Sequence, residues 1–372
     1  CKEININAPI YLSAGLDDAI LEDHPEWQCQ YVDGTTLSAS VASPLRPGFH
    51  RVCFNSPYTY YLVEQIKETL SLFPNCDGIF LDIISQPDCC CVNCMRIMHE
   101  NGLNPLVAAD RQKCSRMALE HYYQLTTQAV TADNPDMPVF HNSGHITPGR
   151  REQLKKYFSH LELESLPTGG WGYDHFPLSA KYVQTLDFDF LGMTGKFHTT
   201  WGEFGGFKHP NALRYECAAM MAFGAKCSVG DQLHPSGKLD ESTYDLIGAA
   251  YAEVEAKEPW CDNVSNVAEI GLLTAAAVNG SSARDIPGDI GAGRILLEGH
   301  FLFDVIDGDA DFKKYRVLIL PDEVAITPAL KKRLDTYLAK GGKLLLSGAS
   351  GVDADGAFMF DIGAKTDGIS PY

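Results

Sequence analysis

The stretch Asp77-Gly78-Ile79-Phe80-Leu81-Asp82-Ile83-Ile84 decides the fold of this chain. A short apolar run that is opened by a glycine and carries a carboxylate near its end predicts a buried strand of a parallel sheet. In α/β barrels, polar residues at the carboxyl ends of the strands carry the chemistry. Asp82 is therefore the first candidate for a catalytic group, the alternative being an aspartate that only caps a helix or orients a loop.

Strands and helices alternate over the first two thirds of the chain, which predicts an α/β fold built on a parallel sheet. Several predicted strands end in polar or charged residues, as in a (β/α)8 TIM barrel. We prefer this barrel to an open doubly wound sheet because no glycine-rich dinucleotide turn follows any strand. The predicted strands are 8–14, 77–84, 137–143, 161–165, 188–197 and 225–232, and the predicted helices include 60–73, 111–131 and 211–223.

A closed barrel of this type needs eight strands, and six are predicted here. The chain also opens at Cys1 without a methionine and passes directly into an apolar strand. We therefore expect a TIM-barrel domain over residues 1–262 that is N-terminally truncated, with the first two strands missing.

A second domain is predicted over residues 263–372, after a helix over 242–258. Its apolar strands and an amphipathic helix that ends before Gly341 and Gly342 predict a flavodoxin-like or glutamine-amidotransferase-like α/β domain. No cysteine follows Cys261, which excludes Cys-His amidotransferase chemistry in this domain. The predicted strands are 267–275, 303–307, 315–321 and 343–347, and the helix is 328–340.

The composition is that of an ordinary globular chain, because 45% of the 372 residues are hydrophobic and 21% are charged. The net charge of −18 argues against binding to nucleic acid or to an anionic membrane, since both require clustered lysine and arginine. The 12 cysteines suit a reducing compartment, and no apolar run approaches the ~20 residues of a membrane span. We expect a cytoplasmic protein with neither a nucleic-acid nor a membrane partner.

Three glutamates accompany Asp82 as candidate catalytic groups. Glu162 and Glu164 lie two residues apart on a predicted strand, so both point to one face, and Glu164 is nearer the strand end. Glu203 lies in a loop rich in glycine and aromatic residues. The alternative for each of them is a solvated carboxylate. Hydrolysis of a glycosidic bond needs one carboxyl group as acid/base and a second as nucleophile, and this chain offers both.

Aromatic residues beside glycines suit a platform for a sugar ring, and His, Asn and Asp at strand ends suit its hydroxyl groups. No organic cofactor motif and no G-x-S-x-G elbow is present. His141 and His145 follow a strand and lack the helix that would make them a metal-binding pair. We expect an oligosaccharide or glycoside as the substrate. The candidate substrate-binding residues are His141, Asn142, Trp171, Tyr173, His198, Trp201, Asp231 and His234.

Four cysteines have the spacing of a structural zinc site. Cys89, Cys91 and Cys94 form a C-x-C-x-x-C motif after the strand that carries Asp82, and Cys53 lies upstream. Tetrahedral zinc takes four Cys or His ligands with short intervals inside each cluster. The alternative is a group of buried free thiols. As a zinc site, the cluster would fix the loop that follows Asp82.

The cysteine pattern resembles the zinc cluster of the family-42 beta-galactosidases, in which a cysteine before Asn-Ser-Pro joins a C-x-C-x-x-C motif. Here the corresponding tripeptide is Asn55-Ser56-Pro57. The resemblance implies that structural zinc is bound and that Cys90 takes no part in binding it. The implied ligands are Cys53, Cys89, Cys91 and Cys94.

The segments Phe303–Asp307 and Val317–Pro321 resemble the trimerisation domain that follows the barrel in those enzymes, which implies a homo-oligomer, a trimer or a dimer. Family-42 enzymes carry Asn-Glu at the end of barrel strand four, where the glutamate is the acid/base. This chain has Leu81-Asp82 there instead, a pattern closer to alpha-L-fucosidases, in which that aspartate is the nucleophile.

The run from His160 to Asp174, with Tyr11–Asp17 and His24–Trp27, resembles hypothetical glycosyl hydrolases related to family 151, which includes alpha-L-fucosidases. This resemblance covers nearly the whole chain. It implies a retaining exo-glycosidase that acts on a fucoside first and a beta-galactoside second. Asp82 would be the nucleophile, and Glu164, or failing it Glu162 or Glu203, the acid/base. The competing class is a non-catalytic carbohydrate-binding protein on a decayed barrel, and the chain alone, without two strands, need not be active.

Overall fold

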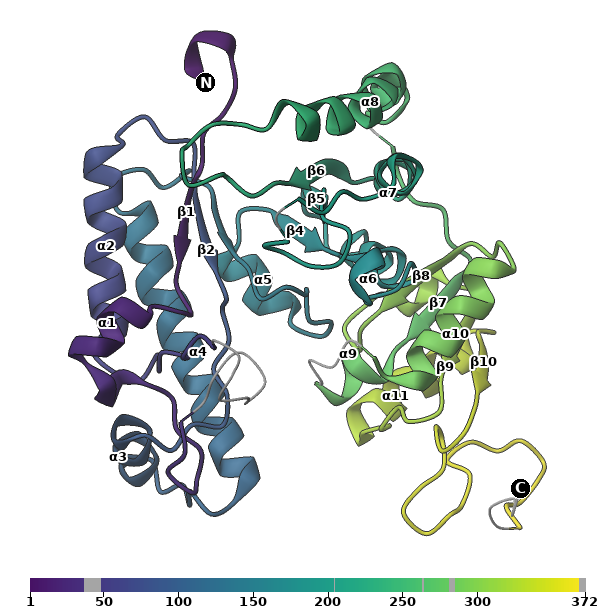
Figure 1. Ribbon diagram of the computed structural model, residues 1–372. Coiled ribbons are helices and arrows are strands. Elements are labelled where there is room, and N and C mark those ends of the chain that lie inside the picture. The colour runs from purple at the N-terminus through teal and green to yellow at the C-terminus, as the bar shows by residue number, and fades with distance from the viewer. Residues whose placement is uncertain (37–47, 204, 263, 281–284, 368–372) are drawn as a thin grey trace. The chain divides into compact units, whose positions relative to one another are not determined.

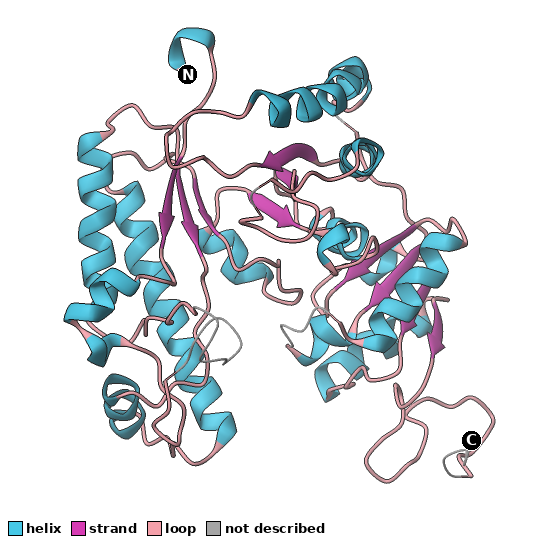
Figure 2. Ribbon diagram, in the orientation of Figure 1, coloured by secondary structure: helices cyan, strands magenta, loops and turns pink. Residues whose placement is uncertain are grey.

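The computed structural model describes residues 1–36, 48–203, 205–262, 264–280 and 285–367 (Figure 1). These residues form two compact units, residues 1–144 with 153–160 and residues 145–152 with 161–372. All the sheet pairings in the described ranges are parallel. The chain is therefore an α/β protein with parallel sheets, as predicted, and Figure 2 shows how helices and strands alternate within it.

The first unit contains a three-stranded sheet in the order β1-β2-β3. Its central strand is β2, which ends at Asp82, and Leu81 on that strand is fully buried. Helices α2 and α4 pack against each other beside this sheet (Figure 1). The strands are β1 (Ile10–Ser13), β2 (Ile79–Asp82) and β3 (Val139–His141). The helices are α1 (Asp18–Asp23), α2 (Tyr58–Leu72), α3 (Val92–Glu100), α4 (Ala108–Thr131) and α5 (Arg151–Tyr157), which begins in residues of the second unit.

The second unit contains two sheets. The first has the order β4-β5-β6, and the second has the order β10-β9-β7-β8. The predicted domain boundary at 262/263 lies inside this unit, between α8 and β7. The first sheet and its helices are β4 (Leu161–Glu164), α6 (His175–Val183), β5 (Phe190–Gly195), α7 (Pro210–Ala222), β6 (Lys226–Gly230) and α8 (Glu241–Lys257). The second has β7 (Ile270–Leu273), α9 (Ala275–Asn279), α10 (Pro287–Glu298), β8 (Phe303–Ile306), β9 (Val317–Leu320), α11 (Pro328–Ala339) and β10 (Lys343–Leu346).

Helix α11 shows how local sequence signals and burial agree. The side chain of Thr327 accepts a hydrogen bond from the backbone N–H of Leu330, and Pro328 occupies the first helical position, so both are standard start signals. Leu330 and Leu334 face the core of the second sheet. The helix ends one residue before its predicted end, and Gly341 follows with a φ of 88°, a left-handed conformation that glycine adopts without strain.

Asp307, which follows β8, holds parts of the second unit together. Its side chain accepts hydrogen bonds from the guanidinium of Arg151, at 3.3 Å, and from the hydroxyl of Tyr182 on α6, at 2.9 Å. Tyr182 in turn accepts a hydrogen bond from the backbone N–H of Gly149. The carboxylate is 1% exposed, so this pairing compensates for its burial.

Across the described residues, no helix combines the length and apolarity needed to cross a membrane.

His141, the last residue of β3, lies in the core of the first unit. Its side chain is 1% exposed and packs edge-on against the rings of Tyr123 and Phe158. Its ring nitrogens lie 3.1 Å from the hydroxyls of Tyr122 and Thr127, both on α4. Burial lowers the pKa of His141 from 6.5 to about 3, because the charged imidazolium cannot be solvated there.

The buried neutral His141 predicts an acid-sensitive fold. In the unfolded chain this histidine gains a proton below pH ~6.5, but in the folded chain it does so only near pH 3, so unfolding is favoured as the pH falls through that window. We expect this group to contribute roughly 1 kcal/mol of lost stability per pH unit below about 6. Urea unfolding at several pH values would measure the slope. The His141→Phe variant, which cannot titrate, should show a shallower slope, and an equal slope in both proteins would contradict the prediction.

Candidate active site and cysteine cluster

Asp82 ends β2, and its carboxylate is held by three hydrogen-bond donors. Oδ2 accepts from the hydroxyl of Tyr11 on β1 at 2.6 Å. Oδ1 accepts from the amide of Asn142, which follows β3, and from the backbone N–H of Ile83, both at 2.8 Å. Both oxygens therefore have donors from the neighbouring strands. A carboxylate fixed in this way keeps one orientation, which nucleophilic attack requires.

The backbone around Asp82 is also constrained. Its carbonyl oxygen accepts hydrogen bonds from the N–H groups of Ala14 and Gly15, each at 3.0 Å. The next residue, Ile83, has a φ of 62°, which is costly for a β-branched side chain. Only glycine fits at position 15, because a Cβ there would lie 1.8 Å from the carbonyl oxygen of Ile83. Such strain clusters at functional sites and supports a role for this strand end.

Glu164 ends β4 in the second unit, and its side chain is held by Trp201. The indole Nε1–H of Trp201 donates to Oε1 of Glu164 at 2.8 Å. Glu164 is 8% exposed, and its register partner on β5 is Met193. Glu162 lies two residues earlier on the same strand and is half-buried. Of the two glutamates, only Glu164 lies at the carboxyl end of the strand.

Glu203 stabilises its own loop. Its carboxylate accepts hydrogen bonds from the backbone N–H and the hydroxyl of Thr199, at 2.7 and 2.8 Å. The hydrogen bonds from Thr199 lower the pKa of Glu203, and a lowered pKa does not favour a general acid. These contacts are those of a carboxylate that caps its own loop.

The predicted substrate-binding residues fall into three groups. His141 is enclosed in the core, with both ring nitrogens near hydroxyls, and offers no surface to a sugar. Asn142 is buried and donates to Asp82, so it positions that carboxylate. The others lie after β4, β5 and β6 in the second unit and are partly or fully exposed. They are Trp171, Tyr173, His198, Trp201, Asp231 and His234.

The structure adds contacts that sequence reasoning missed. Tyr11 was not considered, although its place two residues before Ser13, the register partner of Asp82, puts it on the face of that partner. His175, the first residue of α6, lies 3.2 Å from a ring nitrogen of His145 and 3.2 Å from the hydroxyl of Ser165. The aromatic, glycine-rich run over 169–176 therefore ends in helix α6. No sequence signal announced the histidine contact.

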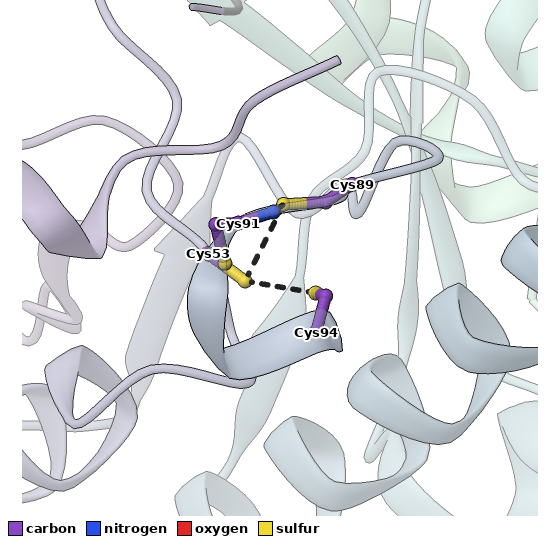
Figure 3. A group of neighbouring side chains, drawn as sticks. All are labelled: Cys53, Cys89, Cys91 and Cys94. Atoms are coloured by element: carbon purple, nitrogen blue, oxygen red, sulfur yellow. Dashed lines mark hydrogen bonds between the residues drawn. The ribbon is translucent and has the colours of Figure 1, made fainter. Parts of the chain in front are cut away.

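Four buried cysteines come together in the first unit (Figure 3). The sulfurs of Cys53, Cys89, Cys91 and Cys94 all lie within 4.8 Å of one another. Sulfurs that surround a tetrahedral zinc at about 2.3 Å are about 3.8 Å apart, and two measured separations from the Cys53 sulfur are 3.4 and 3.8 Å. The described residues therefore offer a cluster that could hold a metal ion, and Cys90 is not part of it, as predicted.

The surroundings of this cysteine cluster suit sulfur anions. The side-chain amide of Asn55 donates to the sulfur of Cys94 at 3.3 Å, and the backbone N–H of Cys91 donates to that of Cys89 at 3.4 Å. Such N–H donors stabilise thiolates in a buried site. Cys91 also caps the start of α3, so the cluster ties Cys53 to the segment that follows Asp82.

Comparison with known proteins finds families and solved structures of glycosidases. Residues 1–83 match the family described as hypothetical glycosyl hydrolase 6, and residues 294–364 match the beta-galactosidase trimerisation domain. A search of curated proteins found no significant match. Among solved structures, alpha-L-fucosidase isoenzyme 2 from Paenibacillus thiaminolyticus is similar over 100% of this chain, with 47% sequence identity and a TM-score of 0.93. This chain covers 56% of that protein's length.

Two beta-galactosidases are similar at lower identity. The enzyme from Bacillus circulans sp. alkalophilus has 14% identity and a TM-score of 0.75, over 94% of this chain and 62% of its own. The enzyme from the Antarctic haloarchaeon Halorubrum lacusprofundi has 16% identity and a TM-score of 0.72, over 96% and 65%. These two similarities show the fold alone. The chain is therefore glycoside hydrolase-like, with a close structural match to an alpha-L-fucosidase and more distant matches to beta-galactosidases.

Proposed function

We propose that this chain belongs to a retaining, exo-acting glycosidase that cleaves alpha-L-fucosides, with Asp82 as the nucleophile. The observation that carries the proposal is the carboxylate of Asp82 at the end of β2, oriented by Tyr11, Ile83 and Asn142. The 47% identity to an alpha-L-fucosidase supports the choice of sugar. In this role Asp82 attacks the anomeric carbon and forms a glycosyl-enzyme intermediate, which water then hydrolyses.

Glu164 is the proposed acid/base. In the first step it gives a proton to the glycosidic oxygen as the aglycone leaves, and in the second it takes a proton from the attacking water. Its burial and its place at the carboxyl end of β4 support this choice. Glu203 ranks lower because its carboxylate is engaged by Thr199, and Glu162 ranks lower because it lies away from the strand end.

The finer fold assignment is part of the proposal. Asp82 ends a strand of one parallel three-stranded sheet and Glu164 ends a strand of the other, and catalytic groups at the carboxyl ends of strands are typical of a (β/α)8 barrel. The two parallel three-stranded sheets would supply six of the eight strands of such a barrel. The order β10-β9-β7-β8 supports a flavodoxin-like second domain, because it follows the doubly wound order in which the first strand lies between the second and the third.

The sugar pocket is proposed to include aromatic side chains that follow β4 and β5. Trp171 lies edge-on to His175, with ring centroids 5.1 Å apart, and Trp201 lies beside Glu164. Indole faces bind the apolar side of a pyranose ring, and neighbouring polar groups bind its hydroxyls. Asp231, His198 and His234 follow β5 and β6 and are the proposed hydroxyl-binding groups.

A second candidate substrate is a beta-galactoside. The match of residues 294–364 to the beta-galactosidase trimerisation domain favours it. The same match supports assembly of a homo-oligomer through the second domain. The fold similarity to beta-galactosidases, at 14–16% identity, does not bear on the sugar, so the fucoside remains first.

Zinc is the metal that we propose for the cysteine cluster. Four buried sulfur donors within 4.8 Å of one another suit Zn²⁺, and four such ligands would leave no open coordination position, so the proposed role is structural. Such an ion would hold the loop between Asp82 and α3 and would take no part in the chemistry. A reducing compartment such as the cytoplasm would keep these thiols free to bind it.

The Asp82→Asn variant of the full-length protein tests the nucleophile. It keeps the shape of the side chain and removes the charge, so we expect turnover of nitrophenyl alpha-L-fucoside to fall roughly a thousandfold or more with the fold intact. Asp77→Asn, the same change before the other end of β2, should leave turnover near that of the wild type. Full activity of the Asp82→Asn variant would remove this residue from the chemistry. Faster hydrolysis of the beta-galactoside than of the fucoside by the wild type would select the second candidate.

Elemental analysis tests the metal. We expect about one zinc ion per chain in protein purified without chelators. Cys94→Ser should reduce the zinc content to near zero, whereas Cys261→Ser, outside the cluster, should not change it. If the purified wild-type protein contains no zinc, or if both variants lose the same amount of zinc, the structural zinc site is contradicted.

A further inference from the structure

Lys208 is a lysine with no exposed side-chain surface, and its ammonium lies in the second unit beside two polar partners. Its ammonium donates to Oε2 of Glu216 on α7 at 2.6 Å and to the hydroxyl of Thr194 on β5 at 2.8 Å. Thr194 donates to the same glutamate oxygen at 2.7 Å. Oε1 of Glu216 accepts from the hydroxyl of Tyr173 at 3.2 Å. The pair is therefore both buried and satisfied.

A buried ion pair of this kind is weak evidence for stability, because desolvation of the two charges offsets their attraction. Its geometry is directional, however. The three atoms Lys208 Nζ, Thr194 Oγ1 and Glu216 Oε2 bond to one another, so Lys208 has one position relative to β5 and α7. An apolar side chain in the same space would not fix the backbone in this way.

Lys208 closes the loop that leaves β5. Its backbone N–H donates to the carbonyl of Lys196 at 2.7 Å, and the N–H of Lys196 donates to the carbonyl of Gly230 at 2.9 Å. Residues 196 and 208 are thus joined at the base of the loop and tied to the end of β6. The ion pair fixes this base to the body of the unit, and the loop carries Trp201.

Trp201 returns from this loop to the strand ends. A Cβ at Gly230 would lie 2.2 Å from the indole ring, and one at Gly195 would lie 3.4 Å from it, so the ring rests on the glycines that end β5 and β6. Phe197 packs edge-on against it, with ring centroids 5.4 Å apart. In this position the indole N–H donates its hydrogen bond to Glu164 on β4. One side chain thereby touches the ends of three neighbouring strands.

We propose that the buried pair of Lys208 and Glu216 positions the acid/base Glu164 by fixing the loop that holds Trp201. Neither residue of the pair contacts the reacting atoms, so both are positioning residues, and Trp201 transmits their effect through its N–H. The inference rests on the proposed role of Glu164. A general acid must meet the leaving oxygen in one geometry, and small displacements lower the rate.

The test uses the double variant Lys208→Met/Glu216→Gln in the full-length protein. Removing both charges avoids the unpaired buried charge that a single substitution would leave, so the variant is expected to fold. Its matched control is Arg214→Met/Glu253→Gln, which removes an exposed ion pair between α7 and α8 in the same unit. Trp201→Phe removes the N–H donor together with the part of the indole ring that rests on the glycines.

The first measurement is the dependence of kcat/KM on the leaving group, because kcat/KM reports the first step alone, in which the aglycone leaves. Poor leaving groups need a proton from the acid in that step, and dinitrophenolate does not. We expect the double variant and Trp201→Phe to lose roughly tenfold to a hundredfold in kcat/KM for a methylumbelliferyl fucoside, and the double variant to show little change in kcat/KM for the dinitrophenyl fucoside. Unchanged kcat/KM of the double variant for both substrates, or an equal loss for both, would overturn the inference.

The second measurement is acrylamide quenching of the Trp201 fluorescence, taken as the difference between each protein and its Trp201→Phe counterpart. We expect stronger quenching in the double variant than in the wild type and the control, because the indole would move away from the two glycines and become more exposed to solvent. Equal quenching in all three would overturn the inference. Glu164→Gln separates the two proposals: if it retains full activity on the poor leaving group, the role proposed for Glu164 fails, while quenching still reports whether the ion pair positions Trp201.

Discussion

The carboxylate of Asp82 and the donors around it are the interaction on which the first unit is organised. The side chain joins β1, β2 and the residue after β3, while its backbone carbonyl holds Ala14 and Gly15. The parallel register makes this possible, because it brings the ends of adjacent strands to the same level. The strained Ile83 then redirects the chain toward the cysteine cluster. The same hydrogen bonds that orient the carboxylate of Asp82 therefore also hold the ends of the three strands together.

The second unit repeats this design with different side chains. Glu164 ends a strand of a parallel sheet, and an aromatic donor from another segment holds it, as Tyr11 holds Asp82. Both donors are aromatic side chains: the ring of Tyr11 stacks on Phe80, and that of Trp201 rests on Gly195 and Gly230. Strand-end carboxylates held in this way support glycosidase chemistry better than the solvated acids that an acidic composition would also provide.

The sequence predicted the element types well where apolar runs were strong. Strand β2, strand β9 and helix α11 lie within a few residues of their predicted ranges, because burial and capping act locally. Helix α10 was missed because Gly288, Gly291 and Gly293 interrupt its pattern. Helix α6 was missed because it begins inside an aromatic, glycine-rich run and has a proline in its first turn, which a helix tolerates.

For the site, the sequence located strand-end carboxylates and the four cysteines but not their partners. Cys89, Cys91 and Cys94 could be predicted because they form a short motif, and Cys53 was assigned through a family resemblance, whereas the donors to Asp82 and Glu164 come from distant segments. His141 illustrates the limit: a polar residue at a strand end resembles a ligand-binding group, and only the rings of α4 and Phe158 show that it belongs to the core.

The cysteine cluster joins positions 53 and 94, far apart in the sequence. An ion bound to sulfurs of the folded chain and not to those of the unfolded chain shifts the folding equilibrium by mass action, by about 2.7 kcal/mol when its free concentration is a hundred times the dissociation constant. The order of the chain after β2 would then depend on how much free metal surrounds the protein. Loss of the metal would then destabilise the fold next to Asp82, as a destabilising substitution would, although the amino-acid sequence stays the same.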